Sequence, residues 1–140
     1  MNEAKEYLKR IRYYDAMIDS KLEELVMLKA KATRITPVMH DTGGIGSGSQ
    51  DRLGNAVAKI VDLEKEIDND VDSLVDLKRE ASSMLRKIDK TAYYNVLHKR
   101  YVQYETFEKI AIDMGYTYRN VLYLHGRALQ EFQKIMDKQK

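Results

Sequence analysis

The chain has 140 residues, of which 44% are hydrophobic and 33% are charged, and its formal net charge is +2. This size fits one domain, or one domain with a helical extension, and a single proline among many helix-forming residues favours an all-α fold. The lack of cysteine excludes disulfides, thiolate metal sites and cysteine nucleophiles. No apolar run approaches the ~20 residues that span a bilayer, so we expect a soluble, cytoplasmic protein and no membrane contact.

A heptad pattern predicts a first helix of about 30 residues, because apolar side chains recur every seven positions at Ile11, Ile18, Leu25 and Ala32. Pro37 should end this helix. Four glycines and two serines follow within residues 41–49, which predicts a flexible loop over residues 36–50.

A second helix of about 37 residues should begin near Asp51, a plausible N-cap. It keeps the seven-residue spacing at Ile60, Ile67, Leu74, Ala81 and Ile88. Residues 1–34 carry a net charge of +2 and residues 60–80 a net charge of −5, which favours pairing of the two helices. We therefore expect a long antiparallel, coiled-coil-like hairpin over residues 1–90, used for oligomerisation or partner binding. Helices of unequal length would leave part of the second seam uncovered, so we also expect a homo-oligomer, such as a dimer.

A short helical segment over about Ala92–Val102 should come next, with an apolar face made by Tyr93, Val96, Leu97 and Tyr101. Residues 91–140 carry a net charge of +3, so the C-terminal part is basic whereas the middle of the chain is acidic.

The spacing over residues 106–124 is that of a helix-turn-helix. Ala111 stands where two helices would cross, and Gly115 follows four residues later, where a tight turn needs positive φ. Thr106 and Thr117 each precede a helical stretch and are suited to N-cap it. The inner faces of the two helices should be formed by Ile110, Met114, Val121 and Leu124.

Four stretches carry a more specific resemblance: residues 100–101 (RY), 106–111 (TFEKIA), 114–117 (MGYT) and 121–129 (VLYLHGRAL). Together they resemble region four of bacterial sigma factors, the domain that reads promoter DNA. The whole arrangement is similar to small phage-encoded transcriptional regulators of the ArpU/RinA type. This resemblance implies a sequence-specific DNA-binding regulator of phage or prophage origin, acting in the cytoplasm of the bacterial host.

The resemblance also implies roles for individual residues. The helix over residues 117–130 would enter the major groove of double-stranded DNA. The base-facing positions would be Tyr118, Arg119, Leu122 and Tyr123, with Asn120 bonding to a base or a phosphate. The phosphate contacts would be Tyr104, Thr106, Lys109, Thr117 and Arg127. Tyr118 and Leu122 depart from the pattern, because sigma factors usually carry charged residues at these positions. RNA polymerase is a second candidate partner of the protein.

Two other functions fit the same pattern: a small terminase-like DNA-packaging subunit, and a protein-only adaptor of RNA polymerase. We expect no enzymatic activity and no cofactor, because no nucleophile, base and orienting group occur together. We also expect no metal site: His40, His98 and His125 are not spaced as ligands, and each should lie at the surface or at its boundary.

Overall fold

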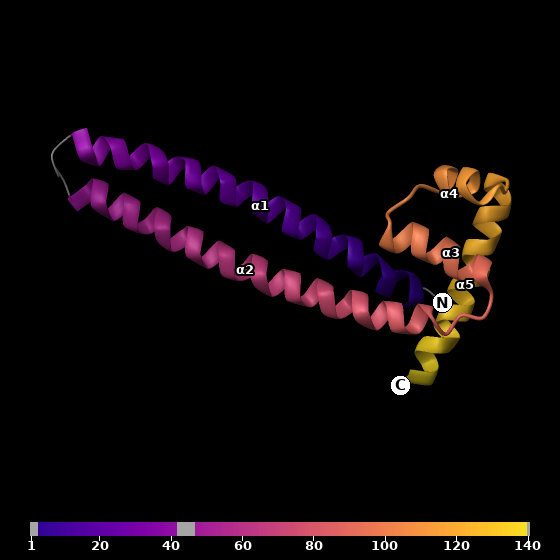
Figure 1. Ribbon diagram of the computed structural model, residues 1–140. Coiled ribbons are helices and arrows are strands. Elements are labelled where there is room, and N and C mark those ends of the chain that lie inside the picture. Colours follow the sequence, from indigo (N-terminus) through magenta and orange to yellow (C-terminus); the bar gives the residue numbers. More distant parts are fainter. Residues whose placement is uncertain (1–2, 42–46, 140) are drawn as a thin grey trace. The chain divides into compact units, whose positions relative to one another are not determined.

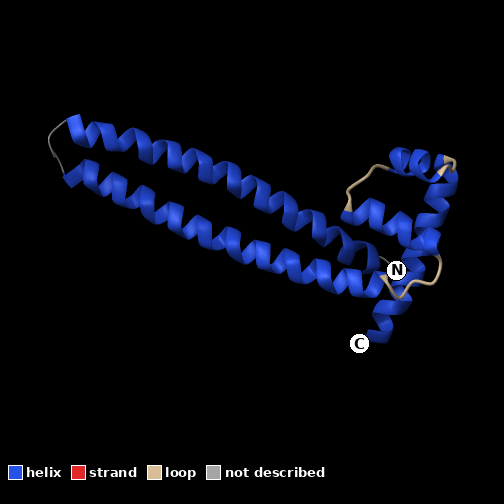
Figure 2. Ribbon diagram, viewed as in Figure 1, coloured by secondary structure: helices blue, strands red, loops and turns tan. Residues whose placement is uncertain are grey.

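The computed structural model describes residues 3–41 and 47–139, and these residues form helices and loops without any strand (Figure 2). In chain order, the elements are α1 (Glu3–Asp41), α2 (Ser47–Leu85), α3 (Thr91–Leu97), the π-helical segment η1 (His98–Val102), α4 (Phe107–Met114) and α5 (Tyr118–Gln139) (Figure 1). The all-α fold class is confirmed for the described residues.

The connection between the two long helices differs from the prediction. Helix α1 continues through Pro37 to Asp41 and α2 begins at Ser47, so the predicted loop over residues 36–50 was wrong at both ends. The rest of that loop, residues 42–46, lies outside the described residues. A proline inside a helix removes one hydrogen bond and costs ~3 kcal/mol, which penalises a long helix without preventing its continuation. Asp51 lies inside α2 and does not N-cap it.

The two long helices have the same length, 39 residues each. The first helix is therefore longer than the predicted length of about 30 residues, whereas the second is close to the predicted length of about 37. The argument for self-association that rested on unequal helices was wrong. Helix α2 ends at Leu85, so Ile88, the last member of the heptad row, lies in the connection to α3. There its N–H donates to the carbonyl of Leu85 at 3.1 Å.

The chain divides into two compact units, one of which is continuous in sequence. This contiguous unit comprises residues 16–73, from the middle of α1 to the middle of α2. Its two helical segments run antiparallel, because Lys21 pairs with Asp70 at 2.6 Å and Lys29 pairs with Glu64 at 3.7 Å. Between them lies a narrow apolar core formed by Leu25, Leu63 and Ile67, with Leu28 and Ile60 at its edge.

The second unit is discontinuous in sequence. This composite unit joins the described residues up to Asp15 with those from Leu74 onward. The Tyr7 hydroxyl donates to Oε1 of Glu80 at 2.8 Å, and the Tyr7 ring lies 5.9 Å from that of Phe132. The N–H of Ala4 donates to Oε1 of Gln133 at 2.9 Å. The sequence-based division at residue 90 thus differs from this one, because contacts across the chain bring the start of α1 to α5.

Helix α3 and η1 form one short rod inside the composite unit. The predicted apolar face is confirmed, since Tyr93, Val96, Leu97 and Tyr101 are all buried. Beyond α3 the backbone widens: the N–H of Gln103 donates to the carbonyl of His98, five residues earlier, at 3.0 Å. This rod lies against α5 and provides the support on which α4 and α5 rest.

Candidate nucleic-acid interface

Helices α4 and α5 each begin at a threonine cap. The side-chain oxygen of Thr106 accepts a hydrogen bond from the N–H of Lys109 at 3.2 Å, and that of Thr117 accepts one from Asn120 at 3.1 Å. Each bond satisfies a backbone donor that has no partner within the first turn of its helix. Both caps predicted from the sequence are confirmed.

The turn between α4 and α5 depends on Gly115, which has φ = 70°. Its N–H donates to the carbonyl of Ile112 at 3.2 Å, and the N–H of Tyr116 donates to that of Ala111 at 2.9 Å. This pair of bonds is a Schellman motif, in which the residue after the helix adopts the left-handed conformation that glycine takes without strain. The predicted positive φ at Gly115 is confirmed.

The inner faces of α4 and α5 meet in a small apolar core. Val96 of α3, Ile110 and Ala111 of α4, and Val121 of α5 are buried together. Phe107, Met114 and Leu124 pack at the edge of this core. All five positions that the sequence assigned to the inner faces and the crossing point are therefore on the inside.

Helix α5 is held along one side only. Its buried residues are Val121, His125, Ala128 and Phe132, which recur every three or four positions. His125 was expected at the surface or its boundary, and this was wrong: its Nε2 lies 2.6 Å from the Tyr101 hydroxyl, and its ring lies 4.9 Å from that of Phe107. Burial lowers the pKa of His125 to about 4, an effect that the charges of Lys5 and Arg100 add to.

Every position of α5 that was expected to face bases is exposed. Arg119 and Asn120 are exposed, and large apolar surface is exposed on Tyr118 (47%), Leu122 (40%) and Tyr123 (60%). At ~100° per residue, Arg119, Tyr123, Arg127 and Lys134 form one stripe along the helix. No Asp or Glu occurs between Asp113 and Glu131. This surface is thus basic and aromatic.

The residues expected to contact phosphates are all exposed except Tyr104, but they are not equally available. Lys109 Nζ lies 2.8 Å from Oε1 of Glu105 and 3.0 Å from Oδ2 of Asp113. Hydrogen bonds to these two carboxylates raise the pKa of Lys109. By contrast, neither Arg119 nor Arg127 forms an ion pair within the part of the chain that the structure describes. The Arg127 guanidinium instead lies 5.6 Å from the centre of the Tyr123 ring.

Tyr104 takes a different place from the expected one. Its hydroxyl donates to Oδ2 of Asp15, and the Arg12 guanidinium lies 5.7 Å from the centre of its ring, so Tyr104 connects the loop before α4 to α1. Tyr104 also has φ = 59°, a left-handed conformation that costs a non-glycine residue roughly 1–2 kcal/mol. Such a conformation persists only where the surrounding contacts hold it.

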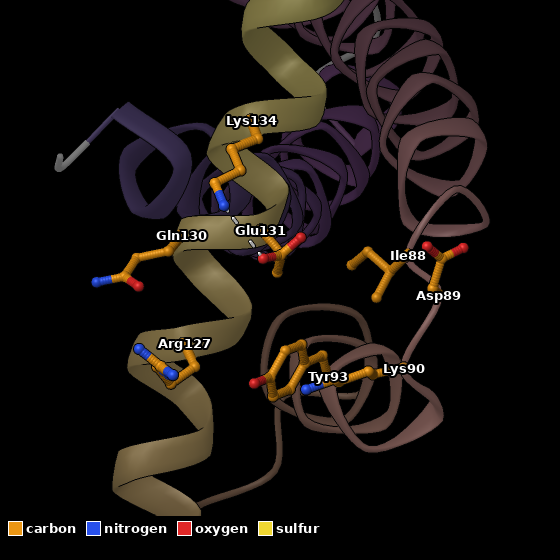
Figure 3. A pocket seen from close by; sticks show the side chains of 8 residues that line it. All are labelled: Ile88, Asp89, Lys90, Tyr93, Arg127, Gln130, Glu131 and Lys134. Carbon is orange, nitrogen blue, oxygen red and sulfur yellow. Dashed lines mark hydrogen bonds and ion pairs between the residues drawn. The ribbon is translucent and has the colours of Figure 1, made fainter.

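Beside the C-terminal half of α5 lies an open pocket of about 290 Å³ (Figure 3). Arg127 and Lys134 of α5 face Lys90 and Tyr93 across it, with Lys90 Nζ at 5.1 Å from the centre of the Tyr93 ring. The carboxylates of Asp89 and Glu131 also line the pocket, and Oε1 of Glu131 lies 3.5 Å from Lys134 Nζ. The sequence analysis missed Lys90 and Lys134. Lys134 follows Arg127 by seven residues, so continuing the helical spacing past residue 130 would have found it.

Other kinds of site find no support in the described residues. Within residues 3–41 and 47–139, no group of three or more His, Asp or Glu side chains could hold a metal ion. None of the helices there is apolar enough over a sufficient length to cross a membrane. No protein-family model, no curated protein and no solved structure matches this chain.

Proposed function

We propose that this protein is a sequence-specific DNA-binding transcriptional regulator, in which α4, the Gly115 turn and α5 form a helix-turn-helix. The single observation that carries the proposal is the two-sided construction of α5. One side is fixed in an apolar core by Val121, His125 and Phe132, and the other exposes Arg119 with its neighbours. A helix with one face packed in the core and the other face exposed can enter the major groove of DNA, which is wide enough to admit an α-helix.

Charge supports the same proposal. The exposed side of α5 presents Arg119 and Arg127 on one stripe, and Lys134 continues this stripe although its Nζ lies 3.5 Å from Oε1 of Glu131. Neutralising phosphates releases counterions from DNA, and this release supplies much of the affinity at low salt. Arg119 lies in the first turn of α5, the part of a recognition helix that reaches base edges, and its guanidinium can form two hydrogen bonds to guanine.

The regulatory part of the proposal rests on the resemblance to sigma region four and to phage regulators of the ArpU/RinA type. Under it, the bound site lies near a promoter in the genome of a phage or its host. Sequencing the DNA recovered with the tagged protein tests this part: recovered sites should cluster upstream of genes. An even distribution over the genome would contradict a promoter-proximal role.

The DNA-binding part is tested with duplexes selected from a random pool. Arg119→Ala should weaken binding to the selected site by roughly 5- to 150-fold, the value of one good base contact, and should weaken binding to random duplex much less. Lys65→Ala, an exposed lysine of α2, is the control and should leave both affinities unchanged. Equal losses on selected and random DNA would contradict base reading by Arg119. No binding at low salt and micromolar protein would contradict the proposal as a whole.

A further inference from the structure

The two sides of the contiguous unit, residues 16–73, differ in character. One side is marked by the Lys21–Asp70 ion pair and the other by the Lys29–Glu64 ion pair. At ~100° per residue, Leu22 and Val26 of α1 project on the Lys29 side. On α2, three valines project on the Glu64 side. We call the side that carries the Lys29–Glu64 ion pair the apolar side. Its exposed apolar residues are Leu22, Val26, Val57, Val61 and Val71.

The ion pair on the apolar side also sets the register of the two helices. Lys29 and Glu64 lie at the same level, 3.7 Å apart. Leu22 precedes Lys29 by one heptad and Val71 follows Glu64 by one heptad. Because the helices run antiparallel, Leu22 and Val71 also lie at one level. Both helices therefore contribute exposed apolar residues to this side at matching levels, with the exposed carboxylates of Asp19 and Asp68 beside them.

The opposite side of the unit is polar, since Glu24, Lys31, Lys59, Glu66 and Ser73 project there. In a two-stranded coiled coil only the seam is apolar and both flanks are charged. A stripe widened on one flank is instead typical of helices that pack against a further layer, as in a four-helix bundle. The described residues of the contiguous unit lack that further layer.

We propose that the apolar side is an interface between two copies of this chain, which form a four-helix bundle. The charges on that side are self-complementary. A twofold axis parallel to the helices places α1 of one copy over α2 of the other at the same level. Lys29 then faces Glu64 of the second copy, and Leu22 faces Val71 of the second copy. Both contacts occur twice, as an isologous interface requires. This inference does not depend on DNA binding.

Two neighbouring residues of α1 provide a matched test. Val26 is 67% exposed and lies on the apolar side, whereas Met27 is 65% exposed and projects away from α2. Sedimentation of the full chain over roughly 1–100 µM should give a dimer, with twice the 16.3 kDa mass of one chain. Val26→Glu should raise the dissociation constant at least ~10-fold, and Met27→Glu should leave it within about twofold.

A charge-reversal series tests the charge complementarity of the interface, and the comparison of Val26→Glu with Met27→Glu separates the interface from general destabilisation. Lys29→Glu and Glu64→Lys should each weaken the dimer, because each puts like charges opposite one another, and the double variant should restore it. Circular dichroism shows whether each variant keeps its helix content. A wild-type chain that stays monomeric at ~100 µM would overturn the proposal. So would equal effects of Val26→Glu and Met27→Glu.

Discussion

The hydroxyl of Tyr101 and Nε2 of His125 lie 2.6 Å apart, and their rings are stacked with centroids 5.7 Å apart. This contact joins η1 to the buried side of α5. Burial raises the pKa of Tyr101 to about 12, so its phenol stays protonated and can donate. Burial also keeps His125 neutral, so that its Nε2 can accept. The helix that we propose to read DNA is therefore fixed from behind by a bond between two uncharged groups.

This pair predicts a loss of stability in mild acid. The pKa of His125 is about 4 in the folded chain and 6.5 when unperturbed, so the unfolded chain binds the proton more readily. The contribution of neutral His125 to the free energy of unfolding is fully present above pH 6.5 and should be lost as the pH drops from 6.5 to 4. At ~1.4 kcal/mol per pH unit, the loss reaches as much as ~3 kcal/mol. Urea denaturation at a series of pH values measures it.

His125→Gln should remove most of this pH dependence, even if it lowers the stability at neutral pH. His98→Gln, at a half-buried histidine outside this contact, should leave the slope unchanged. A wild-type free energy of unfolding that stays constant between pH 6.5 and 4 would contradict the assignment.

The two described glycines near the turn and in α5 should respond oppositely to alanine. A Cβ at Gly115 or at Gly126 would meet no atom within 4 Å, so only the backbone decides. Gly115→Ala places a side chain at φ = 70° and should cost ~1–2 kcal/mol. Gly126→Ala lies inside α5 and should stabilise by ~0.5–1 kcal/mol. Thermal unfolding of both variants measures this, and the same sign for both would contradict the backbone argument.

Leu122 should recognise the methyl group of thymine. It exposes apolar surface in the second turn of α5, beyond Arg119, where a polar side chain would be the usual choice. Replacing deoxythymidine by deoxyuridine in the selected site removes only that methyl group, so binding should weaken by ~1 kcal/mol or more at the contacted positions. Leu122→Ala should bind both probes equally. If the wild type also binds both equally, Leu122 does not read thymine, and the proposed DNA binding itself is untouched.

Lys109 and Arg127 should differ in their contribution to the salt dependence of DNA binding, although both were expected to contact phosphates. Lys109 is already paired with Glu105 and Asp113, whereas Arg127 lies over an aromatic ring. Arg127→Ala should reduce the slope of log K against log salt by about one, the value of one phosphate contact, and Lys109→Ala should change it little. The opposite order would show that DNA draws Lys109 out of its carboxylate pair.

The start of α1 should be essential to the composite unit. Leu8 is fully buried there, so Leu8→Ala should cost roughly 2–5 kcal/mol of folding free energy. Tyr13→Ala, at an exposed position one and a half turns later, should change the stability by no more than ~0.5 kcal/mol. A small effect of Leu8→Ala would mean that residues after 74 fold without the beginning of the chain.

Local signals in the sequence predicted the two threonine caps and the turn between α4 and α5. Thr106, Gly115 and Thr117 act through bonds to residues at most five positions away, so their spacing alone implies their geometry. The ends of the long helices were less accessible, because a proline penalty of a few kcal/mol can be outweighed by the length of helix that forms around it. Glycines and serines over residues 43–49 likewise suggested a loop up to residue 50, although α2 begins at Ser47.

Contacts between distant residues could not be read from spacing. The bond from Tyr104 to Asp15 and the pair formed by Tyr101 and His125 join segments whose sequences carry no sign of one another. The helix-turn-helix pattern also predicted that Lys109 is exposed, but it did not predict that two carboxylates pair with its charge. Its spacing to Glu105 and Asp113, four residues on either side, was the available signal.

The bond from Ala4 to Gln133 spans 129 positions. During synthesis, the contiguous unit can form as soon as residue 73 has left the ribosome, since all its partners have by then been made. The composite unit must wait for α5, and until then Leu8 and Ile11 have no complete set of apolar neighbours. The order of translation therefore completes the paired helices before α5, so under the two proposals a nascent chain can associate with a second copy before it is able to bind DNA.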